Sequence, residues 1–311
     1  MVSALDKRPP TRQPPQSIPG PIGFIGAGKV GTALAALLHA RGVRVVAVSG
    51  RTLDDSRRMA ISAGLSSRVA SDRAGTITNA DLVFLTVPDD DIGPLCDEIA
   101  RKESWRAGQG VVHCSGALPS DVLQSARDQG ALVASFHPLQ TFASRDAALA
   151  HMPGSTFALE GDVALVAQLE QFVHLLGGTA LHLRAEDKTL YHAAATIASN
   201  YTVTLAALAS DLLVLDGVAP DANTALGYLI PLLRGTIDNL HTLGVPGALT
   251  GALARGDAGT VERHLQALEE CAPETARLYR HLARLTLPLA RQKGNLGEST
   301  MKALKRALAE G

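Results

Sequence analysis

Cysteine and aromatic residues are scarce in this chain of 311 residues, which contains three cysteines and 4% aromatic residues. Cys96, Cys114 and Cys271 are scattered along the sequence, a spacing that neither a disulfide framework nor a paired metal-ligand motif has. Scattered free thiols are typical of a reducing compartment. We therefore expect a cytoplasmic protein without a metal site.

An excess of charge of one sign is also absent. The formal net charge is −1 and 46% of the residues are hydrophobic, which is the composition of a soluble globular protein. No basic excess favours a nucleic-acid partner, and no apolar run approaches the roughly 20 residues of a membrane-spanning helix. We expect contact with neither nucleic acid nor a membrane.

The first 20 residues lack an apolar core segment. They contain several prolines among polar residues, a composition that predicts a disordered tail and not a signal peptide. The rest of the chain is long enough for two domains with separate hydrophobic cores.

A glycine-rich turn is the most informative feature that is present. Residues 22–34 read I-G-F-I-G-A-G-K-V-G-T-A-L, a short apolar strand that leads through a G-x-G-x-x-G pattern into an apolar-periodic helix. In a dinucleotide-binding βαβ unit the first glycine makes the tight turn, the second lets the backbone approach a pyrophosphate, and the third lets the helix lie close to the strand. The helix N-terminus then presents unpaired N–H groups to the phosphates. The predicted cofactor-binding residues of this turn are Gly26, Ala27, Gly28, Lys29, Val30 and Gly31.

The end of the second strand indicates which dinucleotide is bound. Proteins that prefer NAD usually carry an acidic residue about 20 residues after the first glycine, whereas strand 43–48 is followed here by S-G-R-T. Arg51 can pair with a 2′-phosphate and stack on the adenine, and Ser49 and Thr52 can donate to the same oxygens. NADP is therefore favoured over NAD; the alternative is that Arg51 is a solvated surface residue.

Strands alternate with helices along residues 21–184. The strands are near-continuous apolar runs of the kind found in a parallel sheet buried on both faces. This alternation predicts an α/β fold with a doubly wound (Rossmann) parallel sheet. Asp54 and Asp55 are expected to begin helix 53–63, and Ser120 to cap a helix over 121–129. After the glycine turn, strands are predicted at 43–48, 81–87, 110–114, 131–136, 155–159 and 179–183, and the other helices at 92–101 and 163–176.

The pattern changes after residue 184, and residues 185–311 are expected to form an all-α C-terminal domain. Apolar residues recur at helical spacing from Glu186 to about Leu215 without a breaker. A helix of about 30 residues is roughly 45 Å long, more than one small domain needs to cover its own core, so we expect a homodimer. The alternative is a central helix wrapped by its own neighbours. Further helices are predicted at 223–243, kinked at Pro231, and at 260–271, 274–290 and 299–308.

Three strand ends carry unusual polar segments, and ligands of an open α/β sheet lie beyond the carboxyl ends of the strands. These segments are T-V-P-D-D-D at 86–91, H-C-S-G at 113–116 and S-F-H-P-L-Q-T-F at 135–142. The aspartates of the first are expected to cap the next helix. Val87 and Pro88 are expected to pass a ribose of the cofactor, Ser115 and Gly116 to hold the nicotinamide carboxamide, and His137 and Gln140 to face the substrate, with a structural histidine as the alternative for His137.

The start of the long helix carries the remaining candidates. Lys188 and His192 are spaced i, i+4, Ser199 returns to nearly the same face, and Asn200 lies on a neighbouring one. A desolvated lysine has a lowered pKa and can exchange a proton with a substrate oxygen. The alternative is that Lys188 is a solvated first-turn residue beside two acidic neighbours.

These motifs together resemble one known family. The glycine turn, S-G-R-T, T-V-P-D-D, H-C-S-G, F-H-P-L-Q-T-F and K-T-L-Y-H-A-A-A-T-I-A-S-N-Y look like the bacterial family with a Rossmann-like domain and a DUF2520 C-terminal domain, over nearly the whole chain from Pro21. That family is similar to the 6-phosphogluconate dehydrogenase superfamily, which includes pyrroline-5-carboxylate reductase, ketopantoate reductase, F420-dependent NADP oxidoreductase and the β-hydroxyacid dehydrogenases. The resemblance implies NADP binding by the first domain and dimerisation through the helical one.

The resemblance also bears on the acid/base residue. In the β-hydroxyacid dehydrogenases the corresponding helix carries K-x-x-x-N, with the lysine as proton donor and acceptor. Lys188 matches the lysine, but His192 stands where the asparagine would be. Because an imidazole titrates near neutrality, the role belongs to Lys188, to His192 or to the pair.

The leading hypothesis is an NADP-dependent oxidoreductase that moves a hydride between the nicotinamide and a small carbonyl, imine or alcohol in an interdomain cleft. Lys188 and His192 would move the proton, and His137, Gln140, Ser199 and Asn200 would contact the substrate. Alternatives are a prephenate-type dehydrogenase, a non-catalytic NADP sensor and a module for another phosphate ligand. F420 also stays open as a redox partner.

Overall fold

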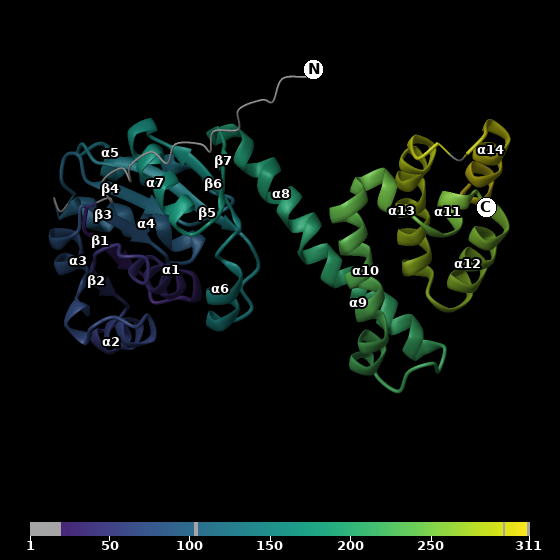
Figure 1. Ribbon diagram of the computed structural model, residues 1–311, viewed down its shortest axis with the longest axis horizontal. Coiled ribbons are helices and arrows are strands. Elements are labelled where there is room, and N and C mark those ends of the chain that lie inside the picture. The colour runs from purple at the N-terminus through teal and green to yellow at the C-terminus, as the bar shows by residue number, and fades with distance from the viewer. Residues whose placement is uncertain (1–19, 103–104, 295, 310–311) are drawn as a thin grey trace, which may run out of the picture. The chain divides into compact units, whose positions relative to one another are not determined.

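The computed structural model describes residues 20–102, 105–294 and 296–309 (Figure 1). The chain divides into two compact units, residues 1–197 and 198–311. This division falls beyond the boundary predicted at 184/185, so the first helical turns after the sheet pack with the sheet. Apart from Gly20, the predicted N-terminal tail lies outside the described residues.

The first unit is built on one seven-stranded sheet with the order β2-β1-β3-β4-β5-β6-β7. Strands β1 to β5 are parallel, β6 is antiparallel to β5, and β7 is parallel to β6. The predicted α/β sheet is confirmed, and the reversal at β6 is the feature that the alternating pattern did not reveal. The strands are β1 Ile22–Ile25, β2 Val45–Ser49, β3 Leu82–Leu85, β4 Gly110–His113, β5 Leu132–Leu139, β6 Thr156–Gly161 and β7 Thr179–His182.

Two apolar clusters, one on each face, hold helices against this sheet (Figure 1). On one face α1 (Lys29–His39), α2 (Leu53–Ser62), α6 (Arg145–His151) and α7 (Val163–Leu175) bury aliphatic side chains around a group of phenylalanines. In that group Phe24 stacks on Phe84 with ring centroids 5.0 Å apart. The other face is covered by α3 (Arg73–Asn79), α4 (Asp89–Arg101) and α5 (Gln124–Arg127), so the sheet is doubly wound.

Local signals account for some helices of this unit and not for others. Thr52 and Asp55 form a reciprocal capping box at the start of α2, as expected for an acidic first turn. The helix predicted over 121–129 is wrong: the segment is a short 3-10 turn, Ser120–Leu123, followed by the four residues of α5. Ser120 does not cap it, because its hydroxyl donates to Glu160 instead. Helices α3 and α6 were not predicted.

The second unit is helical. One prediction for the helical region is wrong at a single residue: Ser199, with φ −107° and ψ −70°, separates α8 from α9. The backbone of α10 departs from helical geometry at Gly244, with φ 69°, directly after the predicted end of helix 223–243. No glycine or proline marks Ser199, which is why periodicity predicted one unbroken helix. Helix α8 (Lys188–Ala198) follows the 3-10 turn Ala185–Asp187, and nearly all of it belongs to the first unit. The helices of the second unit are α9 Asn200–Leu215, α10 Ala222–Ala248, α11 Gly251–Arg255, α12 Ala258–Cys271, α13 Pro273–Gln292 and α14 Glu298–Ala307.

The segment 185–215 is more apolar than the sequence inspection indicated. By length and composition alone it is long and apolar enough to cross a membrane, with a mean hydropathy of 1.3 over its most apolar window. One such helix is weak evidence for a span. Only 6% of that window is buried, so its apolar side chains lack cover within the described chain.

Candidate functional site

The glycine turn joins β1 to α1 and packs against the residue that follows β3. Gly26 has φ 119°, and a Cβ there would collide with the Thr86 carbonyl oxygen. A Cβ on Gly31 would collide with the Thr86 hydroxyl, which itself donates to the Gly26 carbonyl oxygen at 2.8 Å. At Gly28, by contrast, a Cβ would meet nothing closer than 3.7 Å. The fold therefore requires two of the glycines, while the third leaves open the space that a pyrophosphate would occupy.

The end of β2 holds the residues predicted to read the adenosine phosphate. Ser49 is fully buried, and its Oγ has no hydrogen-bond partner among the described residues. Thr52 Oγ1 donates to Asp55 Oδ2 at 3.0 Å and accepts from the Asp55 N–H, so most of its hydrogen-bonding capacity serves the helix cap. Arg51 is exposed and makes no recorded contact with the described chain. Of these two side chains, the exposed Arg51 guanidinium is accessible to a phosphate, whereas the Ser49 hydroxyl is buried.

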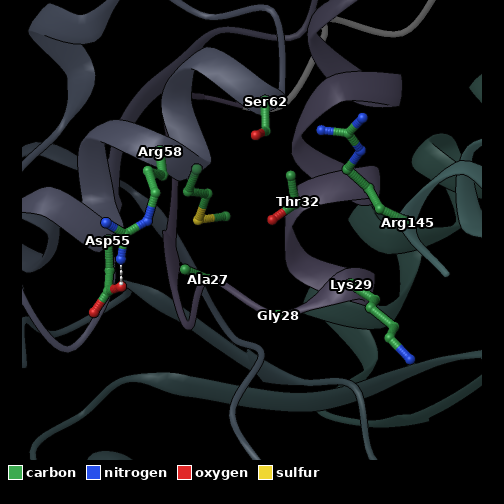
Figure 2. Close-up of a pocket in the computed structure, with 9 residues that line it drawn as sticks. Ala27, Gly28, Lys29, Thr32, Asp55, Arg58, Ser62 and Arg145 are labelled. Atoms are coloured by element: carbon green, nitrogen blue, oxygen red, sulfur yellow. Dashed lines mark hydrogen bonds and ion pairs between the residues drawn. The ribbon is translucent and has the colours of Figure 1, made fainter.

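A pocket of about 220 Å³ lies beside the turn (Figure 2). Arg58 and Asp55 of α2 form an ion pair on one side of the pocket. Lys29 of α1 and Arg145 of α6 lie on the opposite side (Figure 2). Lys29 Nζ donates to the Ala143 carbonyl oxygen at 2.8 Å, which ties the loop before α6 to the start of α1. Sequence reasoning missed Arg58 and Arg145. Arg58 lies inside α2, away from the end of β2, and Arg145 is on a helix that was not predicted. The pocket is lined by Ala27, Gly28, Lys29, Thr32, Asp55, Arg58, Met59, Ser62 and Arg145.

Lys188 is buried at the carboxyl edge of the sheet, with 1% of its surface exposed. Its Nζ donates hydrogen bonds to the Ser115 carbonyl oxygen at 2.9 Å and to Ser135 Oγ at 2.5 Å. Burial lowers the pKa of Lys188 to about 8, against the opposing pull of the Glu160 carboxylate. The alternative that Lys188 is a solvated first-turn residue is therefore wrong.

The Ser115 loop is arranged to support this lysine. The Ser115 hydroxyl donates to Asp89 Oδ2 at 2.7 Å and accepts the N–H groups of Ala117 and Leu118 at 3.1 and 3.0 Å. One donated and two accepted bonds exhaust a hydroxyl, so it has no capacity left for the predicted contact with a carboxamide. Ser115 instead aims its carbonyl at Lys188, and Asp89, expected only to cap a helix, fixes the loop.

A row of buried polar residues crosses the sheet beneath Lys188. His113 of β4, Ser135 of β5 and Glu160 of β6 are register partners on adjacent strands. Glu160 accepts the N–H and hydroxyl of Ser120, both at 2.7 Å. Burial lowers the pKa of His113 to about 3, so its ring is neutral near neutral pH. Sequence reasoning placed Ser135 in an unusual polar segment without giving it a role and missed Glu160, since only the strand register brings both to the lysine.

His137, Tyr191 and His192 form a second group beside Gly116. His137 Nδ1 lies 2.7 Å from the Tyr191 hydroxyl, and the two rings meet edge to face. A Cβ on Gly116 would lie 2.8 Å from His137 Nε2 and 2.9 Å from His192 Cδ2, so both imidazoles lie against this glycine. Burial, with Lys188 nearby, lowers the pKa of His137 to about 4. Tyr191 is a further residue that sequence reasoning missed.

The structure thus brings some of the predicted residues together and leaves others apart. Lys188 and His137 share the edge around Ser115 and Gly116, and His192 joins them. Gln140 is exposed, and its side chain accepts the N–H of the next residue at 2.8 Å. Val87 and Pro88 follow Thr86 and so lie next to the glycine turn. Ser199 and Asn200 belong to the second unit.

Two family models match the chain. A Rossmann-like domain matches residues 7–138, and a domain of unknown function, DUF2520, matches residues 155–286. The chain combines a Rossmann-like domain with a DUF2520 domain. The DUF2520 match begins just before β6, so it includes the reversed end of the sheet as well as Lys188, Tyr191 and His192. No relative among the curated proteins matches the chain.

Several solved structures are similar to this chain over most of its length. The putative NADP oxidoreductase BF3122 from Bacteroides fragilis is 26% identical, with a TM-score of 0.67 over 86% of this chain and 98% of that one. Protein TM1727 from Thermotoga maritima is 25% identical, with a TM-score of 0.69 over 88% and 99%. An imine reductase from Myxococcus stipitatus in complex with NADP⁺ is 21% identical, with a TM-score of 0.56 over 93% and 99%, and shows the same fold.

Alanine substitutions at two glycines of the turn should separate folding from binding. Gly28→Ala is expected to lower the free energy of unfolding by no more than about 1 kcal/mol, because Gly28 is the N-cap of α1 and its Cβ would meet no close neighbour, but to weaken NADPH binding at least about tenfold, because its methyl group enters the space for the pyrophosphate. Gly26→Ala, the matched control, should destabilise the fold by about 1–3 kcal/mol. Denaturant unfolding and calorimetric titration measure both; equal NADPH affinity in Gly28→Ala and wild type contradicts the assignment.

The lowered pKa of Lys188 predicts how stability depends on pH. Its folded pKa of about 8 lies below the ordinary 10.5, so the unfolded chain binds more protons between these values and stability rises with pH across them. From about pH 7 to about pH 10, wild type should gain on the order of 2 kcal/mol relative to Lys188→Met. The buried Trp105, the only tryptophan, reports unfolding of the first unit. Parallel pH dependences for the two proteins would refute the buried cation.

Proposed function

We propose that the protein is an NADP-dependent oxidoreductase that exchanges a hydride between the nicotinamide and a small carbonyl, imine or alcohol. The observation that carries this proposal is the buried amine of Lys188 at the carboxyl edge of a dinucleotide-type sheet. Residues 86–89 connect the two halves of the site, because Thr86 bonds to Gly26 in the turn and Asp89 bonds to Ser115 beside the lysine. The similarity to the Bacteroides fragilis protein supports the same reaction class.

The choice of NADP over NAD rests on the end of β2. The nearest carboxylate that follows this strand is Asp54 or Asp55, and Asp55 is engaged by Thr52 and Arg58. Asp54 pairs with Arg57. A ribose 2′-hydroxyl would therefore lack a free acceptor of the kind that NAD-selective sites provide, whereas the exposed Arg51 suits a 2′-phosphate. Gly28 leaves the backbone N–H groups of α1 accessible to the pyrophosphate.

Bound NADP(H) would supply or accept the hydride, and the residues of this chain would manage the proton. An ammonium has three N–H donors, of which Lys188 uses two on Ser115 and Ser135. The third can donate to a substrate oxygen or nitrogen. With a pKa of about 8, Lys188 is largely protonated at neutral pH yet loses its proton at little cost, which a general acid/base requires.

A non-catalytic NADP sensor fits these observations less well. A sensor needs the glycine turn and Arg51 but has no use for a buried ammonium with one donor left over. Burying Lys188 costs stability, and residues that cost stability are expected where chemistry uses them. A prephenate-type dehydrogenase is a narrower version of the proposed activity.

Turnover and binding can be separated by two variants. Wild type should bind NADPH more tightly than NADH, and Arg51→Ala should weaken NADPH about 10- to 100-fold while sparing NADH, because a charge-assisted bond is lost. Lys188→Met should keep NADPH affinity within a few-fold and lower turnover by about 100-fold or more. Titrations and NADPH absorbance with small keto acids and cyclic imines provide the measurements. Retained turnover in Lys188→Met would remove the lysine from the reaction.

We also propose that the protein is a homodimer through α9 and α10. These helices pack on each other within the second unit and still expose many large apolar side chains, more than a monomer in water is expected to leave open. A second copy of this chain offers the same apolar surface, as a two-fold interface requires. The exposed residues include Tyr201, Val203, Leu205, Leu215, Tyr228, Leu232, Ile237, Leu240 and Leu243.

Light scattering tests the dimer. Wild type should show twice the 32.4 kDa of the chain, and Leu232→Glu should shift it towards the monomer because a charge enters the apolar contact. Val163→Glu, at a still more exposed apolar position on α7, is the control and should leave the mass unchanged. A monomeric wild type at micromolar concentration would refute the proposal.

A further inference from the structure

The direction of the hydrogen bond between His137 and Tyr191 determines whether the other ring nitrogen of His137 is a donor or an acceptor for a ligand. His137 Nδ1 and the Tyr191 hydroxyl are 2.7 Å apart, and neither side chain makes another recorded hydrogen bond with the described residues. A phenol is a stronger acid than a neutral imidazole N–H, and an imidazole nitrogen is a better acceptor than a phenol oxygen. The hydroxyl therefore donates to Nδ1, and the ring proton resides on Nε2.

Both partners are held in the protonation states that this arrangement needs. Burial, followed by the charge of Lys188, lowers the pKa of His137 to about 4, so the ring is neutral at neutral pH. Burial raises the pKa of Tyr191 to about 12, so the phenol keeps the proton that it donates. Nε2–H is then a fixed donor located beside Gly116.

The groups around Gly116 are donors, while the nearby carboxylates are engaged. Lys188 retains one N–H after bonding to Ser115 and Ser135. Asp89 accepts from the Ser115 hydroxyl, and Glu160 accepts twice from Ser120. In the first unit, this edge of the sheet thus holds two N–H groups without an acceptor among the described residues, and Lys188 adds a positive charge.

We infer that Tyr191 is a positioning residue that holds His137 in the Nε2–H tautomer, so that His137 and Lys188 donate jointly to one oxygen of a carbonyl substrate or of its alcohol product. The inference rests on the proposed function and narrows its substrate class. A carbonyl oxygen accepts two hydrogen bonds and gains negative charge as it is reduced, so both donors stabilise it increasingly. A protonated imine carries a positive charge and its own N–H, and Lys188 would repel it.

The tautomer can be read directly in the free protein, before any cofactor or substrate is added. Nitrogen-15 NMR of the imidazoles, with His137→Gln to assign the resonances, should show a pyrrole-type Nε2 and a pyridine-type Nδ1 for His137. Tyr191→Phe should convert this into an exchanging mixture of tautomers. A pyrrole-type Nδ1 in wild type, or an unchanged tautomer in Tyr191→Phe, would overturn the positioning role.

The chain contains a matched control for this substitution. Tyr279 of α13 lies with its hydroxyl 3.0 Å from Nδ1 of His264 on α12, and these rings also meet edge to face. Tyr279→Phe removes the same group from an equivalent pair in the second unit and should leave the His137 resonances as in wild type. A shift of His137 in Tyr279→Phe would show that the response to Tyr191→Phe is unspecific.

The substrate class has its own probes. Sodium formate supplies an anionic oxygen, and methylammonium chloride supplies a cationic N–H group in place of a protonated imine. At equal ionic strength, formate should shift the His137 Nε2 resonance, with an affinity that Tyr191→Phe lowers about two- to tenfold, and methylammonium should not. No shift with formate, or a shift with methylammonium, would refute the oxygen site. Because these readings need no NADP, they stand apart from a failure of the proposed oxidoreductase activity.

Discussion

The buried ammonium of Lys188 is the interaction on which the site depends. It rests on two neutral oxygens, those of the Ser115 backbone and the Ser135 hydroxyl, and no carboxylate of the described residues bonds to it directly. Desolvation without a paired charge is costly, and it is the main reason why the lysine pKa falls to about 8. A fold keeps such a group only where the rest of the structure supplies enough apolar burial, and the two clusters around the sheet do so here.

The elements around Lys188 hold its ammonium group in place. Asp89 at the start of α4 fixes the Ser115 loop, and the same connection bears Thr86, which packs against the glycine turn. One short stretch after β3 therefore couples the predicted nucleotide site to the predicted proton donor. The reversal of β6 places Glu160 opposite Ser135, close enough to raise the lysine pKa but engaged by Ser120.

Much of this could be predicted from the sequence, and the remainder has a common cause. Local patterns were sufficient to predict three features. Buried parallel strands are apolar runs, the glycines of the turn have a fixed spacing, and the i, i+4 spacing of Lys188 and His192 places them on one helix face. The partners of Lys188 and His137 lie 73, 53 and 54 residues away along the chain. Strand register brings Ser135 to the site, and the contact of α8 with the sheet brings Tyr191 to His137; no local pattern encodes either. The interruption at Ser199 likewise has no breaker residue to mark it.

The central claim is that Lys188 is a buried amine of lowered basicity. NMR titration of isotopically labelled lysine side chains, with Lys188→Met to assign the resonance, measures it most directly. The account predicts a midpoint near 8 for Lys188, below the ordinary lysine value of 10.5. A midpoint for Lys188 at or above that ordinary value would contradict the burial of the cation and, with it, the proposed role in proton transfer.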